Sequence, residues 1–280
     1  MDQQSTYNLT RHFKDILLII AHFTFVASHA FISSSFASTD FNFLPAHQST
    51  YSIEKFGTYI GNMHNELTHQ GEQLSYISTT KAVGFAALFV KNDFIETSIL
   101  NWPGNDSKKT PQQQSYHLFR GEKHKKNQNI SFDWRDNKTL KLSGSYKNRK
   151  YNLSSTQPVW GRQLLPLLMS HKLLSENPNS THTFYITDKG NLQKYTYTQE
   201  GTENIYLSGK MYPTLKFKIK KEASESWSYT WLSSKHYYLP LKIEQYKDGE
   251  LNVNMQMTHF NQVALETTNA NIQLEDDEYE

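Results

Sequence analysis

Apolar and polar residues alternate with a period of two along much of the chain beyond residue 45. This alternation gives a segment one apolar face and one polar face, as in an antiparallel strand with one side in the core. We therefore expect a chain rich in antiparallel strands. The clearest apolar positions are Ile130, Phe132 and Trp134, then Leu215, Phe217 and Ile219, then Trp227, Tyr229 and Trp231.

Turn signals divide the pattern into hairpins. Residues 239–246 and 251–257 flank an Asp-Gly pair, which supplies the positive φ that a tight hairpin turn requires. Lys189-Gly190-Asn191 predicts a second turn, with Asp188 as a turn residue beside it. Residues 82–90 form a continuous apolar run, which we interpret as a strand buried on both faces. Residues 101–128 are polar, contain two prolines and are predicted to be mostly a long loop.

One segment departs from this period. Between residues 160 and 174, leucines and Trp160 recur at helical spacing, and Pro178 lies beyond the end as a stop signal. The predicted fold is therefore mainly β: a curved antiparallel sheet or open half-barrel, with one short helix packed on it.

The N-terminus has the pattern of a secretory signal peptide. Residues 1–15 are polar with two basic side chains, residues 16–32 are mostly apolar, and serines follow. Cleavage after Ala37 fits best, and Ala30 is the alternative. An uncleaved anchor helix stays open as a second interpretation. We expect a signal peptide at residues 1–37 and a periplasmic protein with no stable transmembrane span after cleavage.

The rest of the chain shows no sharp boundary. We predict a single β-rich domain over residues 38–265 and an acidic, disordered tail over residues 266–280. The chain has no cysteine, which excludes disulfides, an N-terminal lipid anchor on cysteine, iron–sulfur clusters and a catalytic thiol. Its 17 Tyr, 16 Phe and 5 Trp exclude a chain that is disordered throughout.

Charge is unevenly distributed, although the whole chain carries a formal charge of only +2. Residues 120–150 hold most of the excess of basic side chains, and an anionic head group is a candidate partner for them. The candidate contacts are Lys141, Lys147 and Arg149. A solvated basic face is the alternative. Nucleic acid is not expected as a partner, since no nucleic-acid motif accompanies the charge.

No catalytic motif is found, and we expect neither an enzyme nor a cofactor. His64, Glu66 and His69 form H-x-E-x-x-H, but on a strand His69 would point away from the other two. No metal site is therefore predicted. The candidate ligand contacts are aromatic: Trp160, Trp227, Tyr229 and Trp231. An ordinary aromatic core is the alternative interpretation of these rings.

The order of several short motifs resembles an uncharacterised family of exported Gram-negative proteins, the domain-of-unknown-function family DUF3108. Tyr51 with Gly57 and Gly61 looks like its opening strand, and Phe132-Asp133-Trp134 is similar to its middle strand. Trp231-Leu232 followed by residues 239–243, LPLKI, looks like its most specific signature. The resemblance covers residues 45–262 and implies a signal-bearing periplasmic β-protein, with no catalytic residues to transfer.

We therefore expect a non-enzymatic binding protein whose curved sheet cradles a lipid or other amphipathic envelope ligand. The alternative is a cell-envelope glycan-binding or assembly factor, with stacked rings and Asn and Gln side chains as its contacts. An envelope protein as partner fits this second hypothesis.

Overall fold

The structure is a computed structural model that describes residues 44–71, 73–90, 92–102, 109–121, 124–135, 139–175 and 181–263. The predicted signal peptide, residues 1–37, and the predicted tail, residues 266–280, lie outside the described residues. Among the described residues, no helix is long and apolar enough to cross a membrane.

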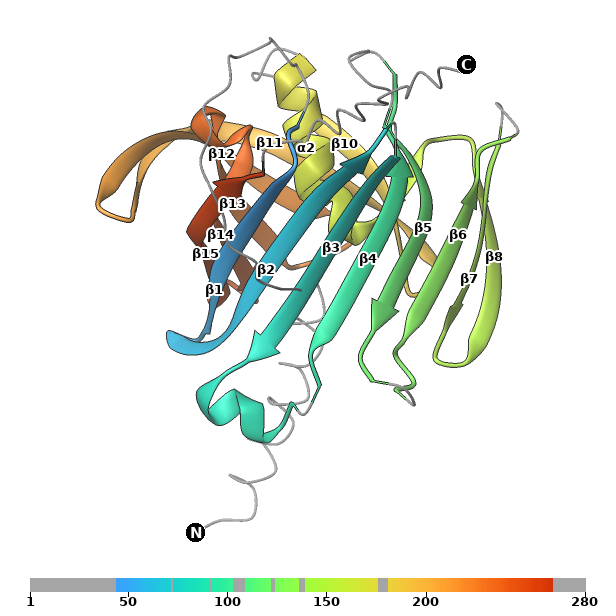
Figure 1. Cartoon of the computed structure of the whole chain (residues 1–280), viewed down its shortest axis with the longest axis horizontal. Helices are drawn as coiled ribbons and strands as arrows, with labels where there is room; N and C mark the ends of the chain where they lie inside the picture. Colours follow the sequence, from blue (N-terminus) through green and yellow to red (C-terminus); the bar gives the residue numbers. More distant parts are fainter. Residues whose placement is uncertain are drawn as a thin grey trace, which may run out of the picture.

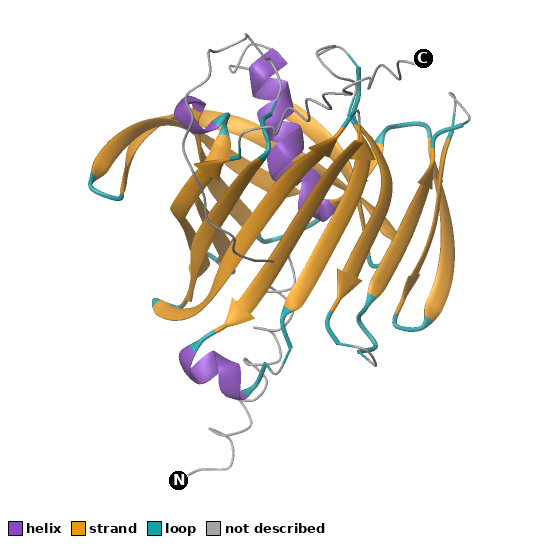
Figure 2. Ribbon diagram, in the orientation of Figure 1, coloured by secondary structure: helices purple, strands orange, loops and turns teal. Residues whose placement is uncertain are grey.

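The described strands form one curled sheet of fifteen strands (Figures 1 and 2). The first eight are β1 (His47–Lys55), β2 (Thr58–Gln70), β3 (Gln73–Ala82), β4 (Phe94–Asn101), β5 (Gln112–Phe119), β6 (Gln128–Asp133), β7 (Leu140–Tyr146) and β8 (Arg149–Ser155). The others are β9 (Val159–Gly161), β10 (His182–Asp188), β11 (Asn191–Leu207), β12 (Lys210–Lys221), β13 (Trp227–Ser233), β14 (Leu239–Lys247) and β15 (Glu250–Gln262). The predicted fold class is confirmed.

The chain begins in the middle of the sheet. β1 pairs with β2 on one side and with β15 on the other, so β1 to β8 run outward to one edge and β9 to β15 return from the other. Every pair is antiparallel except β9 with β10. Because neighbours alternate in direction, the β1–β2, β3–β4, β5–β6, β7–β8 and β14–β15 connections share one end of the sheet. We call it the η1 end, after the 3-10 helix η1 (Gly84–Leu88) between β3 and β4.

The helix α2 (Leu165–Ser175) lies against the concave face of the curl (Figure 2). It is buried on nearly all sides, and even Ser170 and His171 are covered. The large apolar cluster that it joins draws on β1 to β4 and on β10 to β15. A smaller cluster lies on the inner face of β5 to β7 and against β9; its buried members are Tyr116, Leu118, Ile130, Phe132, Leu140, Leu142 and Val159.

A buried polar seam joins β9 and the 3-10 helix η2 (Arg162–Leu164) to β3, β4 and β5. The Gln163 amide donates to Ser78 Oγ at 2.9 Å and to the Glu96 carbonyl at 3.1 Å, and it accepts from Ser98 Oγ at 2.6 Å. Buried polar groups are stable only when paired in this way. The seam therefore fixes the short edge strand against the interior of the sheet.

Three sequence predictions need correction. Residues 82–90 are not a buried strand: β3 ends at Ala82, Gly84 adopts φ +54°, and η1 follows with Phe85 exposed. The segment 101–128, predicted to be mostly a long loop, contains the eight-residue strand β5. Asp188 is not simply a turn residue, because it is buried and pairs with Arg162 at 3.5 Å.

Candidate functional site

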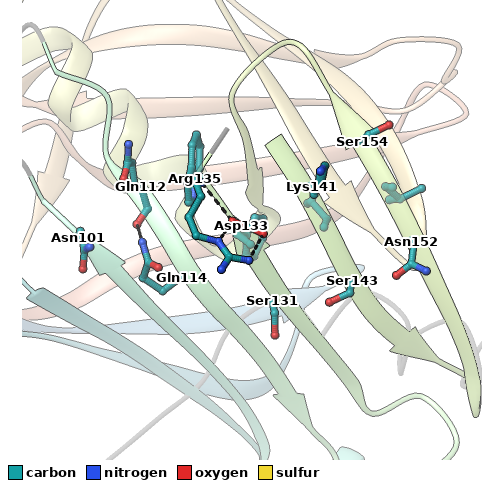
Figure 3. A pocket seen from close by; sticks show the side chains of 14 residues that line it. Asn101, Gln112, Gln114, Ser131, Asp133, Arg135, Lys141, Ser143, Asn152 and Ser154 are labelled. Atoms are coloured by element: carbon teal, nitrogen blue, oxygen red, sulfur yellow. Dashed lines mark hydrogen bonds and ion pairs between the residues drawn. The ribbon is translucent and has the colours of Figure 1, made fainter. Parts of the chain in front are cut away.

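A polar hollow of about 880 Å³ opens on the outer face of β5 to β8. Two cross-strand rows form its floor, with Ser131 opposite Ser143 and Ser143 opposite Asn152 in the first. In the second row, Lys141 lies between Asp133 and Ser154. Figure 3 shows these side chains on three adjacent strands, with Gln112 and Gln114 on β5 beside them.

The hollow follows from strand alternation. On β6 and β7, Phe132 and Leu142 turn inward to the smaller apolar cluster, which leaves Ser131 and Ser143 on the outer face. Serine side chains are short, so the floor is low while longer side chains at the margin rise above it. The result is a trough in which half of the lining residues carry hydroxyl or amide groups, which both donate and accept hydrogen bonds, while Phe132, Trp134, Leu142 and Leu153 add apolar surface.

Three charged groups stand at one margin of the hollow. Arg135 holds Asp133 in a two-point contact, with Nε at 2.9 Å from Oδ1 and Nη2 at 2.7 Å from Oδ2 (Figure 3). The hydrogen bonds from Arg135 keep the pKa of Asp133 well below its usual range. Asp133 is therefore a carboxylate at neutral pH, and with Arg135 and Lys141 the margin carries one net positive charge.

An indole ring lines the same hollow. Trp134 is half-buried, and its Nε1 donates to the Gln113 carbonyl at 2.6 Å, which fixes the ring beside the trough. Trp134 ends the alternating segment that the sequence singled out. A fixed ring next to amides and hydroxyls is a surface on which a sugar can stack and form hydrogen bonds.

Three of the four predicted aromatic contacts share the outer face of β13. Trp227, Tyr229 and Trp231 lie side by side there, and Trp227 stacks on Tyr246 with centroids 5.5 Å apart. Lysines from the neighbouring strands cover these rings: Lys218 Nζ lies 5.6 Å from the Trp227 centroid, and Lys242 Nζ lies 4.7 Å from that of Trp231. Such cation–π contacts already occupy ring faces that a ligand would need.

The hairpin of β11 and β12 adds cover to this surface. Glu203 accepts a hydrogen bond from Trp231 Nε1 at 2.7 Å and pairs with Lys216 at 2.6 Å. Farther along, Gln256 on β15 donates to the Tyr206 carbonyl at 3.1 Å. We call residues 201–215 the arm, because these contacts hold it against the outer face of β13 and β15. Trp231 is only 2% exposed as a result.

The remaining predicted contacts do not meet. Trp160 is buried in β9, where it packs edge-on against Phe184 and donates to the Pro111 carbonyl at 2.8 Å. Lys141 lines the polar hollow, whereas Lys147 and Arg149 lie at the far end of the β7–β8 hairpin, at the η1 end. Ligand contact by these residues stays a prediction.

The histidine pattern on β2 behaves as its strand spacing predicts. His64 Nδ1 lies 2.7 Å from Thr50 Oγ1, while His69, on the opposite face, bonds the Leu44 carbonyl at 3.0 Å. Within the described residues, no group of three or more His, Asp or Glu side chains could hold a metal ion.

The concave face is occupied. It was predicted to cradle a ligand, but α2 and the larger apolar cluster fill it, with Met169 and Leu241 fully buried. The outer hollow, by contrast, is open at the surface.

Comparison with protein-family models matches residues 48–258 to DUF3108, described as a protein of unknown function. The chain belongs to the DUF3108 family. No curated protein matches it. The resemblance drawn from the sequence motifs is thereby confirmed.

Three solved structures are distantly similar. A Bacteroides fragilis protein described as exported, with a YmcC-like fold, is 11% identical with a TM-score of 0.33, covering 77% of this chain and 95% of its own. MucB is 11% identical with a TM-score of 0.33, covering 79% of this chain and 54% of its own. The hypothetical lipoprotein YmcC of Escherichia coli is 10% identical with a TM-score of 0.28, covering 79% and 89%.

The residues on the floor of the hollow were missed at the sequence level. Ser131, Ser143 and Asn152 are polar positions of alternating strands, and such positions ordinarily face water without further meaning. The signal that could have revealed the hollow was the small size of these residues, because three short polar side chains lie in register across adjacent strands. Register across strands separated by a turn cannot be read without the structure.

Proposed function

We propose that this DUF3108 protein is an exported, non-enzymatic binding protein of the cell envelope that holds a glycan-like ligand in the polar hollow. The observation that carries the proposal is the lining: hydroxyls and amides on the floor, with the Trp134 ring and one net positive charge at the margin. Sugars present alternating donors and acceptors together with apolar ring faces, which this set of groups complements.

The charges refine the ligand class. Arg135 is engaged with Asp133, so Lys141 is the group best placed to contact a carboxylate or phosphate on a sugar. The signal pattern of residues 1–37 supports export, and a periplasmic location is part of this proposal. The proposal favours the glycan alternative over the lipid hypothesis because the concave face is filled by α2.

The test is binding of acidic and neutral oligosaccharides from the envelope, measured by calorimetry with the purified protein. Ser143→Tyr places a ring on the floor of the hollow and should abolish binding while leaving the thermal midpoint unchanged. Lys141→Gln should weaken binding of acidic oligosaccharides by roughly tenfold to a hundredfold, since a hydrogen bond to a charged group contributes about 1.5–3 kcal/mol, and leave binding of neutral ones unchanged.

Thr198→Tyr is the matched control, because Thr198 is exposed on β11, away from the hollow. Native mass spectrometry of the protein purified from cells supplies the opposing outcome. If a lipid co-purifies with the protein and the Ser143→Tyr variant retains it, the glycan proposal is wrong. The ligand site would then lie on the concave face.

A further inference from the structure

Large apolar side chains are exposed together at the η1 end. Leu88 is 70% exposed, Phe85 58% and Phe89 47%, and Phe56 in the β1–β2 turn is 60% exposed. Exposed apolar residues scattered singly need no explanation, but a group of them marks an interaction surface. We call Phe56, Phe85, Leu88 and Phe89 the apolar tip.

The apolar tip lies outside the core, exposed to solvent. η1 projects beyond the ends of β3 and β4, as Figure 2 shows. Its base is fixed, since the Val83 amide donates to the Ile60 carbonyl at 3.0 Å and Ala86 is only 3% exposed. Phe85 and Phe89 form an edge-to-face pair with centroids 5.1 Å apart. A single small residue thus anchors η1 while its large side chains face outward.

Basic side chains lie at the same end of the sheet. The β5–β6 and β7–β8 connections both open there, because the strands from β1 to β8 alternate in direction. In sequence, the β5–β6 connection carries Glu122 against four basic residues, whereas the β7–β8 connection and the start of β8 carry no acidic residue. Arg120 is buried, so the basic side chains that reach the surface among the described residues are Lys125, Lys126, Lys147, Arg149 and Lys150.

Two other lysines at this end have acidic neighbours. Lys81 pairs with Asp93 at 3.3 Å, and Lys247 lies 3.4 Å from the carboxylate of Asp248. The positive charge is therefore concentrated to one side of the apolar tip. Lys147, Arg149 and Lys150 are all exposed there. We call these three residues the basic turn.

We propose that the η1 end docks on the surface of an anionic lipid bilayer, with the apolar tip inserted among the head groups and the basic turn above it. Phe and Leu side chains of surface-bound proteins bury their apolar area at the head-group boundary. Stable attachment takes two signals, such as an apolar one and a basic one, and this end supplies both. Each basic residue near an anionic surface contributes roughly fivefold to affinity.

Flotation of the purified protein with vesicles tests this docking. We expect binding to vesicles of phosphatidylethanolamine with phosphatidylglycerol, and weak binding to pure phosphatidylcholine. Phe85→Ser, Leu88→Ser and Phe89→Ser together should abolish binding. Neutralising the basic turn by substitution of all three residues with Gln should reduce binding by roughly a hundredfold, from fivefold per residue, and remove most of its salt dependence.

Tyr206→Ser with Met211→Ser is the matched control, because both residues are exposed on the arm, at the opposite end of the sheet. This variant should bind vesicles like the unchanged protein. Leu88→Trp gives a direct readout of insertion: its fluorescence should be quenched by brominated acyl chains in anionic vesicles. It also tests the proposal if the triple variant fails to fold.

Two results would overturn the proposal. One is equal binding by the triple serine variant and the unchanged protein, with no quenching of the Leu88→Trp ring. The other is a dimer in solution that the triple variant converts to monomer, without vesicle binding by either. That second result would assign the apolar tip to another copy of this chain.

Discussion

The guanidinium of Arg162 lies 3.3 Å from the carboxylate of Glu96, and both side chains are buried. Asp188 lies 3.5 Å away on the other side of the same guanidinium. Burial raises the pKa of Glu96 despite the attraction of Arg162. Burial also opposes ionisation of Asp188, but Arg162 and Lys189 outweigh it and lower the pKa of Asp188. One cation thus joins β4 to β10 through the interior.

Arg162→Met should strongly destabilise the fold. It leaves two carboxylates buried beside each other, and loss of one partner from a buried pair typically costs about 3–5 kcal/mol. The loss, measured by urea unfolding, should be smaller at acid pH, where protonation of Glu96 and Asp188 relieves the uncompensated charge.

Arg135→Met is the control for this prediction. Arg135 makes an even shorter ion pair, with Asp133 at 2.7 Å, but its side chain is 91% exposed. Exposed pairs contribute little because water and salt screen them. The midpoint of unfolding should stay unchanged. Equal losses in the two variants would contradict the assignment of Arg162 as the structural cation.

His47 should make the protein sensitive to acid. Burial lowers the pKa of this ring to about 4, although its hydrogen bond to the Pro45 carbonyl acts in the opposite direction. The unfolded chain, with an ordinary pKa near 6.5, binds the proton more tightly than the folded one. The contribution of His47 to the free energy of unfolding is therefore fully present above pH 6.5, the pKa in the unfolded chain, and is lost as the pH falls toward 4. The loss between pH 7.5 and pH 5 is about 2 kcal/mol.

His47→Leu isolates this contribution. The variant keeps an apolar side chain against Phe260, whose ring centroid lies 5.5 Å from that of His47. The other histidines titrate equally in both proteins, so the difference between their pH profiles belongs to His47. Parallel profiles of unfolding free energy from pH 7.5 to pH 5 would show that burial does not lower the pKa of His47.

Glu203→Ala should release the arm without unfolding the sheet. The carboxylate accepts from Trp231 Nε1 and pairs with Lys216, and both contacts hold the arm in place. Because Glu203 is partly exposed, we expect a local loss of about 1 kcal/mol, or roughly fivefold faster amide exchange. Hydrogen exchange over residues 201–215 is the measurement, and Thr198→Ala is the control. Protection unchanged in this segment would mean that Gln256 alone fixes the arm.

Local chemistry predicted the hairpins well. At Asp248-Gly249 both residues adopt positive φ, 53° and 85°, as the Asp-Gly signal requires. The prediction of a buried strand over the apolar run 82–90 was wrong because hydrophobicity alone cannot distinguish a buried strand from an exposed apolar turn. Gly84 was the available signal, since its φ of +54° ends the strand.

The alternation of apolar and polar residues could not predict which residues far apart in the sequence would meet. Trp227, Tyr229 and Trp231 face outward, although alternation alone would turn this apolar side of β13 to the core; which side turns inward is set by the register of β13 with β12 and β14. Asp188 looked like a turn residue because its partner, Arg162, is remote in sequence. The hollow depends on the register of three strands, which the tertiary structure sets.

The pairing of β1 with β15 has a consequence for how the molecule is made. Residues 47–55 find one of their two neighbours only at residues 253–262, almost at the end of the described chain. During synthesis or export from the N-terminus, β1 emerges with an open edge that stays unsatisfied until nearly every other strand has appeared. Loop closure over such a separation is slow, and exposed edges promote aggregation. The β1–β15 pairing can therefore form only after nearly the whole described chain has been made, and we expect the open edge of β1 to be a site of aggregation until then.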